Sequence, residues 1–378
     1  MRYLKWCPCA LIEGNLAGRV LEKHCKDILE QNLLKSGETL LVATAHEYEL
    51  ELVSGFLSAA SEIGATGGHL AIIPKISERE FVGGLTKWHW DLYASADLLI
   101  TITQYPNHDR LPRPSSDYIE KTGDHPFRTD YEFINRPGSR TRWLDLMMPV
   151  PLQRIYFPRR ERAELSLKGA KIVERAKEIS VTNPAGTDLV AKKSGRPGHA
   201  QYGIADSPGR WDNFGYACVG TAPEEFSAEG KVVIQPGDII PDLHPYPIIL
   251  DPITLKFNGG YVTSIEGGLS AKLFRRLLSS FEDKESYGTS HTGFGLHERA
   301  TLGHGTGEEI DAFHHNYRGS ILFSLGMNYG HGLGGAETRY SGLGPGTRKA
   351  NSHTHFTLFD SSFYCDDELI VNEGRLLL

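Results

Sequence analysis

The chain has 378 residues, of which 40% are hydrophobic and 23% charged, and its formal net charge is −7. This length predicts two domains or one large domain, and the composition is that of a folded protein with a real core. An acidic chain without a long basic stretch is not typical of nucleic-acid-binding proteins, so neither DNA nor RNA is expected as a partner.

The cysteines and the hydropathy pattern indicate the compartment. The five cysteines are scattered and odd in number, so we expect no disulfide framework, which suits a reducing cytoplasm. No apolar run reaches the roughly 20 residues that a membrane-spanning helix needs. The N-terminal residues also lack the pattern of a signal peptide. We therefore expect a soluble cytoplasmic protein with no membrane partner.

The first third of the chain alternates between predicted strands and helices. Short apolar runs predict strands at Thr39–Thr44, His69–Ile73 and Ala96–Thr101. Apolar residues at helical spacing predict a helix over Tyr48–Ile63, which the glycine-rich residues 64–68 would end. Strands that alternate with helices are typical of a parallel sheet covered by helices.

A long polar segment separates this part from the rest. Tyr105–Pro158 is rich in Pro, Arg, Asp and Gly, which indicates a functional loop or a connection between domains. A helix over Leu165–Ala176 and a strand at Ile179–Thr182 are predicted to follow. We therefore expect an N-terminal α/β domain over residues 1–160 and a second domain over residues 161–378.

The second domain is predicted to be α+β and rich in strands. Turn-forming residues are concentrated in Val181–Leu189, Ala205–Asp212 and Ser227–Gly230. The predicted strands are Val232–Gln235, Ile248–Leu250, Thr254–Phe257 and Tyr261–Ile265, and the predicted helix is Ser270–Ser280.

Histidines gather near the C-terminal end. Eight of the sixteen histidines lie between His291 and His355, in a window that is also rich in glycine. Glycine lets the backbone approach a ligand closely. His353 and His355 are two residues apart in a predicted strand, so their side chains should project from the same face. With one further ligand, this pair would form a facial metal site that keeps positions open for substrate and O₂.

The other polar residues of this window have simpler interpretations. A single histidine is more often a hydrogen-bonding group than a ligand, and we interpret four of them in this way: His297, His304, His314 and His315. His331 lies between two glycines and is a candidate substrate contact. Ser324, on the apolar predicted strand Ile321–Gly326, would by default be a small core residue whose hydroxyl bonds to backbone.

Several motifs of the C-terminal half resemble the 2,5-dihydroxypyridine 5,6-dioxygenases, a family related to the aminopeptidase T metallopeptidases. GRWD and SHTGFG are the most specific of these motifs. The segments that carry the resemblance are AGTDL (Ala185–Leu189), ADSPGRWD (Ala205–Asp212), SAEG (Ser227–Gly230), PGDII (Pro236–Ile240), YGTSHTGFGL (Tyr287–Leu296), LFSLG (Leu322–Gly326) and SHTHFTLF (Ser352–Phe359). The resemblance implies an aminopeptidase T-like fold whose C-terminal domain binds the metal.

The resemblance also implies an Fe(II) enzyme that inserts both atoms of O₂ into a hydroxylated aromatic or N-heterocycle and works as a homo-oligomer. The matching iron ligands are His291 and His353, with a carboxylate two residues after the second, and the matching Ser324 lies beside the metal. This chain has His355 where the family has an aspartate. A three-histidine site would carry one more unit of positive charge, which favours a substrate that brings a negative charge. Imidazole still suits iron.

A dioxygenase of this kind needs a base that takes the proton of the substrate hydroxyl. A histidine whose pKa is near neutral is suitable. His108 is one candidate, because it follows the predicted strand Ala96–Thr101 and sites form at the carboxyl ends of parallel strands. His199, just before the GRWD motif, is the other.

Two alternatives share the predicted fold, which by itself does not decide between them. A metalloaminopeptidase would need two metals roughly 3.5–4 Å apart, normally bridged by carboxylates. The matching segments offer two histidines and Ser324 in their place. The other alternative is a non-catalytic binding protein, against which the concentration of histidines argues.

Overall fold

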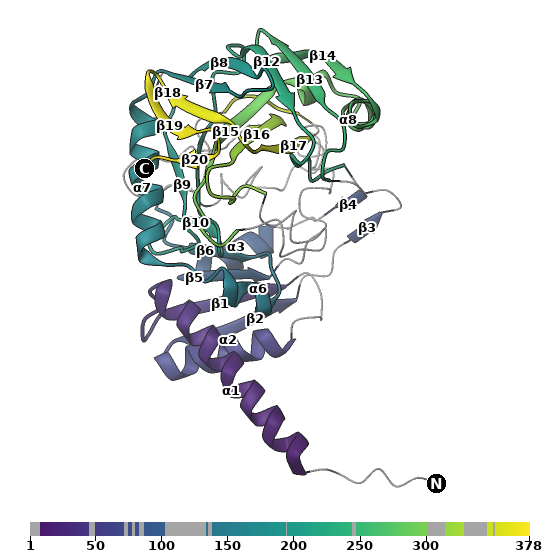
Figure 1. The fold of residues 1–378 in the computed structure, drawn as a ribbon. Coiled ribbons are helices and arrows are strands. Elements are labelled where there is room, and N and C mark those ends of the chain that lie inside the picture. The colour runs from purple at the N-terminus through teal and green to yellow at the C-terminus, as the bar shows by residue number, and fades with distance from the viewer. Residues whose placement is uncertain are drawn as a thin grey trace.

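A parallel α/β layer and a pair of antiparallel sheets make up this protein (Figure 1). The computed structural model describes residues 8–44, 50–71, 75–77, 80–82, 87–102, 134, 138–193, 195–243, 247–300, 314–328, 346–350 and 352–378. Within these ranges, no helix combines the length and the apolar character needed to cross a membrane.

The N-terminal sheet is parallel throughout, with strand order β10-β6-β5-β1-β2. Helices α1 and α2 pack on one face through Ile28, Leu29 and Phe56, and α3 packs on the other through Trp90 and Tyr93. This confirms the predicted helix-covered parallel sheet. The elements are α1 (Pro8–Gln31), β1 (Thr39–Thr44), α2 (Leu50–Ile63), β2 (Thr66–Ala71), α3 (Lys87–Ser95), β5 (Leu98–Ile102), β6 (Arg142–Leu146) and β10 (Trp211–Asn213), with a small hairpin of β3 (Lys75–Ser77) and β4 (Glu80–Val82).

Strand β6 corrects the prediction of a long loop over Tyr105–Pro158. The strand contains the charged residues Arg142 and Asp145, a composition typical of a surface segment, but both side chains are buried and paired. The guanidinium of Arg142 donates to Glu38 at 2.7 Å, and the carboxylate of Asp145 accepts from the Thr101 hydroxyl at 2.9 Å. Helix α6 (Val150–Ile155) also lies within the segment predicted as a loop.

The GRWD motif lies in a segment predicted to be rich in turns, but its last two residues begin strand β10, which pairs with β6. Arg210 and Asp212 form a fully buried ion pair beside it. The Arg210 guanidinium also donates to the carbonyls of Ala200 at 3.1 Å and Ile204 at 2.8 Å, and lies 3.7 Å from the centre of the Tyr202 ring. Arg210 therefore joins the parallel sheet to the segment that leads from β9.

Two antiparallel sheets form the C-terminal part, as the prediction of a β-rich unit requires. The larger, in the order β14-β13-β12-β8-β7-β18-β19-β20, contains β7 (Glu178–Thr182), β8 (Asp188–Lys192), β12 (Glu229–Ile234), β13 (Ile253–Asn258), β14 (Tyr261–Gly267), β18 (Ser362–Cys365), β19 (Glu368–Asn372) and β20 (Arg375–Leu376). The five-stranded sheet, in the order β17-β16-β15-β11-β9, contains β9 (His199–Gln201), β11 (Cys218–Thr221), β15 (Thr289–Gly295), β16 (Ile321–Gly326) and β17 (His353–Leu358). The accompanying helices are α7 (Arg160–Arg175), α8 (Leu269–Ser280) and the short η2 (Lys284–Tyr287).

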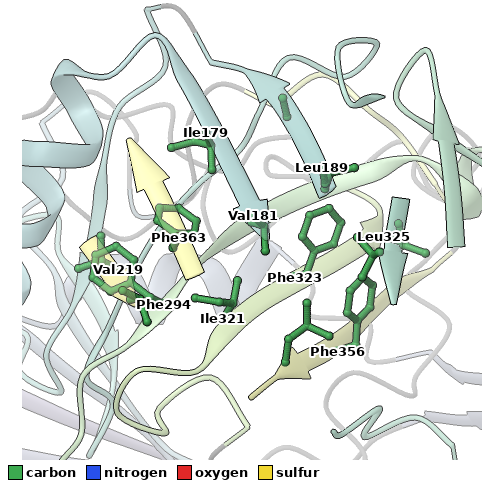
Figure 2. Packing of buried hydrophobic residues seen from close by; sticks show 14 of the residues in the cluster. Ile179, Val181, Leu189, Val219, Phe294, Ile321, Phe323, Leu325, Phe356 and Phe363 are labelled. Atoms are coloured by element: carbon green, nitrogen blue, oxygen red, sulfur yellow. The ribbon is translucent and has the colours of Figure 1, made fainter. Parts of the chain in front are cut away.

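A phenylalanine-rich core fills the space between these two sheets (Figure 2). Phe323 stacks on Phe356 with ring centres 4.9 Å apart, and Phe257 of the larger sheet meets Phe323 edge-on at 5.8 Å. Phe294 meets Phe363 at 5.3 Å in the same way. The core thus covers one face of the five-stranded sheet and leaves the opposite face for other residues.

Two predicted strands differ from those observed. Ile248–Leu250 forms no strand and makes only a single bridge, between Ile248 and Ile239. Pro247 and Pro252 flank this segment, and proline cannot donate to a strand ladder. Strand β2 begins at Thr66, so Gly67 and Gly68 belong to the strand, whereas Gly64, with a φ of +85°, directly follows the last residue of α2 as predicted.

We expect Arg210→Ala to lower the free energy of unfolding by about 3–5 kcal/mol, because it leaves Asp212 charged and buried without its partner. Arg160→Ala is the matched control, since its ion pair with Glu164 is exposed and is worth about 1 kcal/mol or less. Urea unfolding followed by circular dichroism measures both. Equal losses in the two variants would contradict a special role for the buried pair.

Candidate metal centre

The histidines of β17 lie on the face of the five-stranded sheet that points away from the phenylalanine core. The register pairs Ser324 with His355 and Gly326 with His353. Side chains alternate along a strand, so the core residues Phe323 and Phe356 occupy the opposite face. The ring centres of His353 and His355 are 4.4 Å apart, which confirms that the two imidazoles project together.

The His291 side chain, on strand β15, lies close to both of these imidazoles. Its Nε2 lies 3.2 Å from Nε2 of His353, and its ring centre lies 5.4 Å from that of His355. Nδ1 of His353 is 2.7 Å from the carbonyl oxygen of Met327. Because a carbonyl oxygen can only accept, that bond places the proton of His353 on Nδ1 and leaves the lone pair of Nε2 facing His291. This is the usual orientation of a metal-binding histidine.

Gly326 makes the Met327 contact possible. It has a φ of +94°, in the left-handed region, and turns the chain at the end of β16. A Cβ atom there would lie 2.2 Å from the carbonyl oxygen of Ser352. Met327 can then accept from His353 while its own amide donates to Ser352 at 2.7 Å. This geometry explains why the last residue of LFSLG, next to the histidines, is a glycine.

Ser324 contacts the backbone of His291. The pairing of β15 with β16 shifts between Thr289 and Thr292, so the ladder is irregular where His291 lies. The Ser324 hydroxyl accepts from the His291 amide at 3.0 Å and lies 3.4 Å from the His291 carbonyl oxygen. It thereby replaces ladder bonds that the irregularity removes. The role of Ser324 beside a bound metal stays a prediction.

His315 joins the cluster, although no sequence pattern separates it from ordinary histidines. Ligand nitrogens of His291, His315 and His355 all lie within 4.8 Å of one another. The His315 ring is 4.4 Å from that of His355, and its neighbour His314 lies 3.9 Å from it. The only signal available was the His314-His315 doublet in a histidine-rich window, and a doublet does not reveal which ring faces a site.

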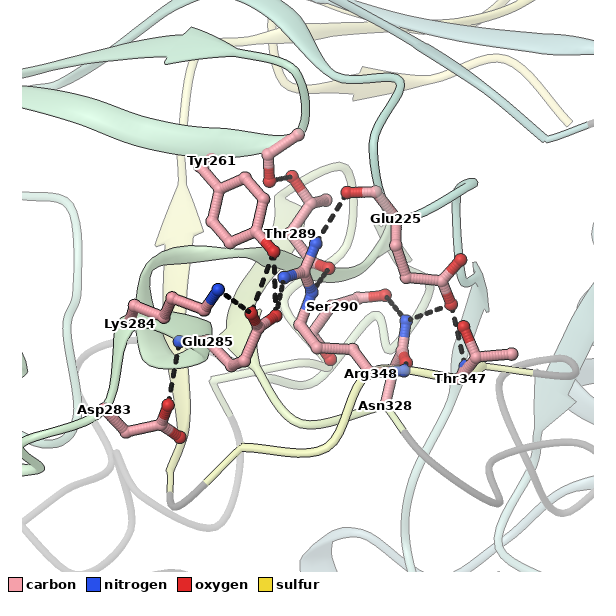
Figure 3. A network of polar contacts seen from close by, with 11 residues as sticks. Glu225, Tyr261, Asp283, Lys284, Glu285, Thr289, Ser290, Asn328, Thr347 and Arg348 are labelled. Carbon is pink, nitrogen blue, oxygen red and sulfur yellow. Dashed lines mark hydrogen bonds and ion pairs between the residues drawn. The ribbon is translucent and has the colours of Figure 1, made fainter.

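A polar network braces the backbone next to the cluster (Figure 3). Burial alone would raise the pKa of Glu225, but hydrogen bonds from Arg196 and from the Thr347 amide lower it to about 2. Its carboxylate also accepts from Asn328 at 3.3 Å, and Asn328 donates to the Ser290 carbonyl at 3.3 Å. Since Ser290 precedes His291, a permanently charged carboxylate supports the position of that histidine from behind.

Arg348 ties the same region to the edge of the larger sheet. Its guanidinium donates to the Glu225 carbonyl at 2.6 Å, forms an ion pair with Glu285, and lies 4.4 Å from the centre of the Tyr261 ring. The Tyr261 hydroxyl donates to the same Glu285 carboxylate at 2.9 Å. Every charge of this group is therefore compensated, so the network serves as a scaffold.

His199 shares the face of the cluster but lies two strands from β15. Gly220 pairs with both His199 and Gly293, which puts the β9 and β15 backbones about 10 Å apart. Burial, together with the charge of Arg210, lowers the pKa of His199 to about 3, so its ring is neutral at physiological pH. The other two predicted catalytic histidines, His108 and His331, lie outside the described residues.

The residues present fit a single transition-metal ion. Three imidazole nitrogens, those of His291, His315 and His355, lie within 4.8 Å of one another and can close on one ion. Imidazole suits Fe, Zn, Cu and Ni. Among the described residues that could hold a metal together, this group contains no carboxylate, whereas two-metal hydrolytic sites depend on bridging ligands. The Asp242 carboxylate is close but accepts from the His355 amide at 3.3 Å.

Comparison with known proteins identifies proteins that are similar to this chain. The chain is 27% identical over 362 residues to a 2,5-dihydroxypyridine 5,6-dioxygenase of Pseudomonas putida KT2440, covering 95% of this chain and 90% of that protein. The solved structure of 2,5-dihydroxypyridine dioxygenase from the same strain has a TM-score of 0.77 at 23% identity, covering 95% of this chain and 97% of that one. Wild-type AmpT from Thermus thermophilus has a TM-score of 0.57 at 16% identity, covering 95% and 99%. At these identities the two structures establish the fold.

The family model described as 2,5-dihydroxypyridine 5,6-dioxygenase matches residues 136–378, well over half of the chain. The match includes the whole histidine cluster and confirms the resemblance that the motifs carried. The chain therefore belongs to the 2,5-dihydroxypyridine 5,6-dioxygenase family and is an oxidoreductase of the dioxygenase class.

Proposed function

We propose that this protein uses Fe(II) and O₂ to open the ring of 2,5-dihydroxypyridine or a closely related hydroxylated N-heterocycle. The observation that carries the proposal is the imidazole cluster on the polar face of the five-stranded sheet. A homo-oligomer in the cytoplasm, with domains over residues 1–160 and 161–378, belongs to the same proposal.

In this proposal His291, His353 and His355 hold the iron. Fe(II) supplies the electron transfer that allows O₂ to react with a closed-shell ring. The donors are neutral imidazoles, so the site favours a substrate whose hydroxyl has lost its proton. The Met327 carbonyl keeps Nε2 of His353 facing His291, while Ser324 fixes the His291 backbone. These contacts hold the ligands in place before the substrate arrives.

The proton of the substrate needs an acceptor. His108 remains the proposed base. With a pKa near 3, His199 is a weak base, which supports a different role, that of a neutral imidazole that forms a hydrogen bond with the substrate on the same face of the sheet. His331 remains a proposed substrate contact. The aminopeptidase alternative lacks support from the donor set, since the cluster consists of imidazoles.

Anaerobically purified protein is expected to contain about one iron per chain, and His353→Ala is expected to lose it, because Nε2 of His353 faces His291 inside the cluster. Elemental analysis measures both. His89→Ala, a change on helix α3 of the parallel sheet, is the control and should retain iron. Two zinc or cobalt ions per chain would favour the hydrolase, and no metal after reconstitution would end the proposal.

With 2,5-dihydroxypyridine, the iron-loaded protein should consume one O₂ per substrate and abolish the ring absorbance. Labelling with ¹⁸O₂ should place both atoms in the product, as a dioxygenase requires. A pyridine that carries only one of the two hydroxyls is the control and should react far more slowly. Normal iron loading without O₂ uptake on any dihydroxypyridine would refute the proposed substrate class.

Ser324→Ala should lower iron affinity or kcat/KM by roughly 10–100-fold, the usual effect of removing a group that orients a metal ligand. Ser320→Ala is the matched control, because Ser320 is also buried and its hydroxyl donates to a backbone carbonyl, that of Tyr317, at 2.8 Å. Chelator competition and steady-state kinetics measure the two variants. Equal losses would mean that the Ser324 effect is one of general stability.

A further inference from the structure

His315 is held next to the cluster by bonds on both sides of it. The His314 carbonyl accepts from the Thr357 hydroxyl of β17 at 2.7 Å. On the other side, the Asn316 side chain accepts from the Ala217 amide at 2.7 Å, and its carbonyl accepts from the His297 amide at 2.9 Å. The backbone that carries the His315 ring is therefore fixed to three separate parts of the five-stranded sheet and its edges.

The ring of His315 approaches the cluster from outside that sheet. Its centre lies 4.4 Å from the His355 ring and 5.7 Å from the His291 ring, while the Tyr216 ring meets it edge-on at 6.2 Å. His291 and His355 are buried, whereas His315 is half-buried. It therefore reaches the cluster from a segment that belongs to none of the strands of the sheet.

We propose that His315 is a fourth imidazole ligand of the metal, beside His291, His353 and His355. This inference rests on the proposed function, which supplies the metal. It is motivated by the nitrogens of His291, His315 and His355, which form the group within 4.8 Å. The chain thus has an added neutral donor as well as a histidine in place of the family's aspartate.

A four-imidazole site defines how substrate fits. Iron with six positions would keep two open ones, one for O₂ and one for a single substrate oxygen. The hydroxyls of a 2,5-dihydroxypyridine lie across the ring from each other, so only one of them can reach a given metal. The proposal therefore selects substrates that bind through one deprotonated hydroxyl, and adjacent diols, which need two positions, should bind poorly.

The test compares His315→Gln with His89→Gln, a control on helix α3, outside the cluster. Metal-free protein is loaded anaerobically with Co²⁺, and affinity is measured by chelator competition together with the Co²⁺ absorption spectrum. We expect His315→Gln to weaken Co²⁺ binding by about 10–100-fold and to change the spectrum. His89→Gln should stay close to wild type in both. His291→Gln should abolish binding, which checks the proposed function separately.

His315→Cys should produce a new absorption band, and a loss of folding cannot produce such a band. A thiolate ligand should add a sulfur-to-cobalt charge-transfer band in the near ultraviolet, which wild type and His89→Cys lack. If His315→Gln binds Co²⁺ like wild type and His315→Cys shows no such band, His315 is not a ligand. In that case loss of binding in His291→Gln would leave the proposed function standing, and its retention would overturn both.

Discussion

The alternation of side chains along the five-stranded sheet is the constraint on which the centre depends. Burying Phe323 and Phe356 against the larger sheet fixes the register of β16 and β17. Ser324 and His355 must then point to the opposite face, because a slip of one residue would exchange the two sets. The apolar core thus orients the polar site, and a change in the core would displace the histidines of the cluster.

Irregular backbone places two contacts of the histidines that the regular alternation of a strand would not provide. A regular ladder would hold β15 flat, but its register shift brings the His291 backbone under the Ser324 hydroxyl. The left-handed turn at Gly326 directs the Met327 carbonyl at His353. Buried ionic groups such as Glu225 and Arg348 then support these positions from outside. Rigid strands and a few specific deviations together preorganise the centre.

Sequence patterns predicted the elements that follow simple periodicity. Strands β1, β5, β16 and β17 and the projection of His353 with His355 were foreseen from apolar runs and spacing of two. Strand β6 was missed because the pairing of Arg142 and Asp145 with distant partners is invisible in a local window. His315 was missed for the same kind of reason, since its approach to His355 depends on folding between distant segments.

The side chain of Asn328 connects three segments that are distant in the sequence. It donates to the Glu225 carboxylate and to the Ser290 carbonyl, each at 3.3 Å, and it accepts from the Arg348 amide at 2.8 Å. A single substitution at this amide would therefore disturb the support of His291 and the position of Arg348 together, although neither residue is its neighbour in the chain.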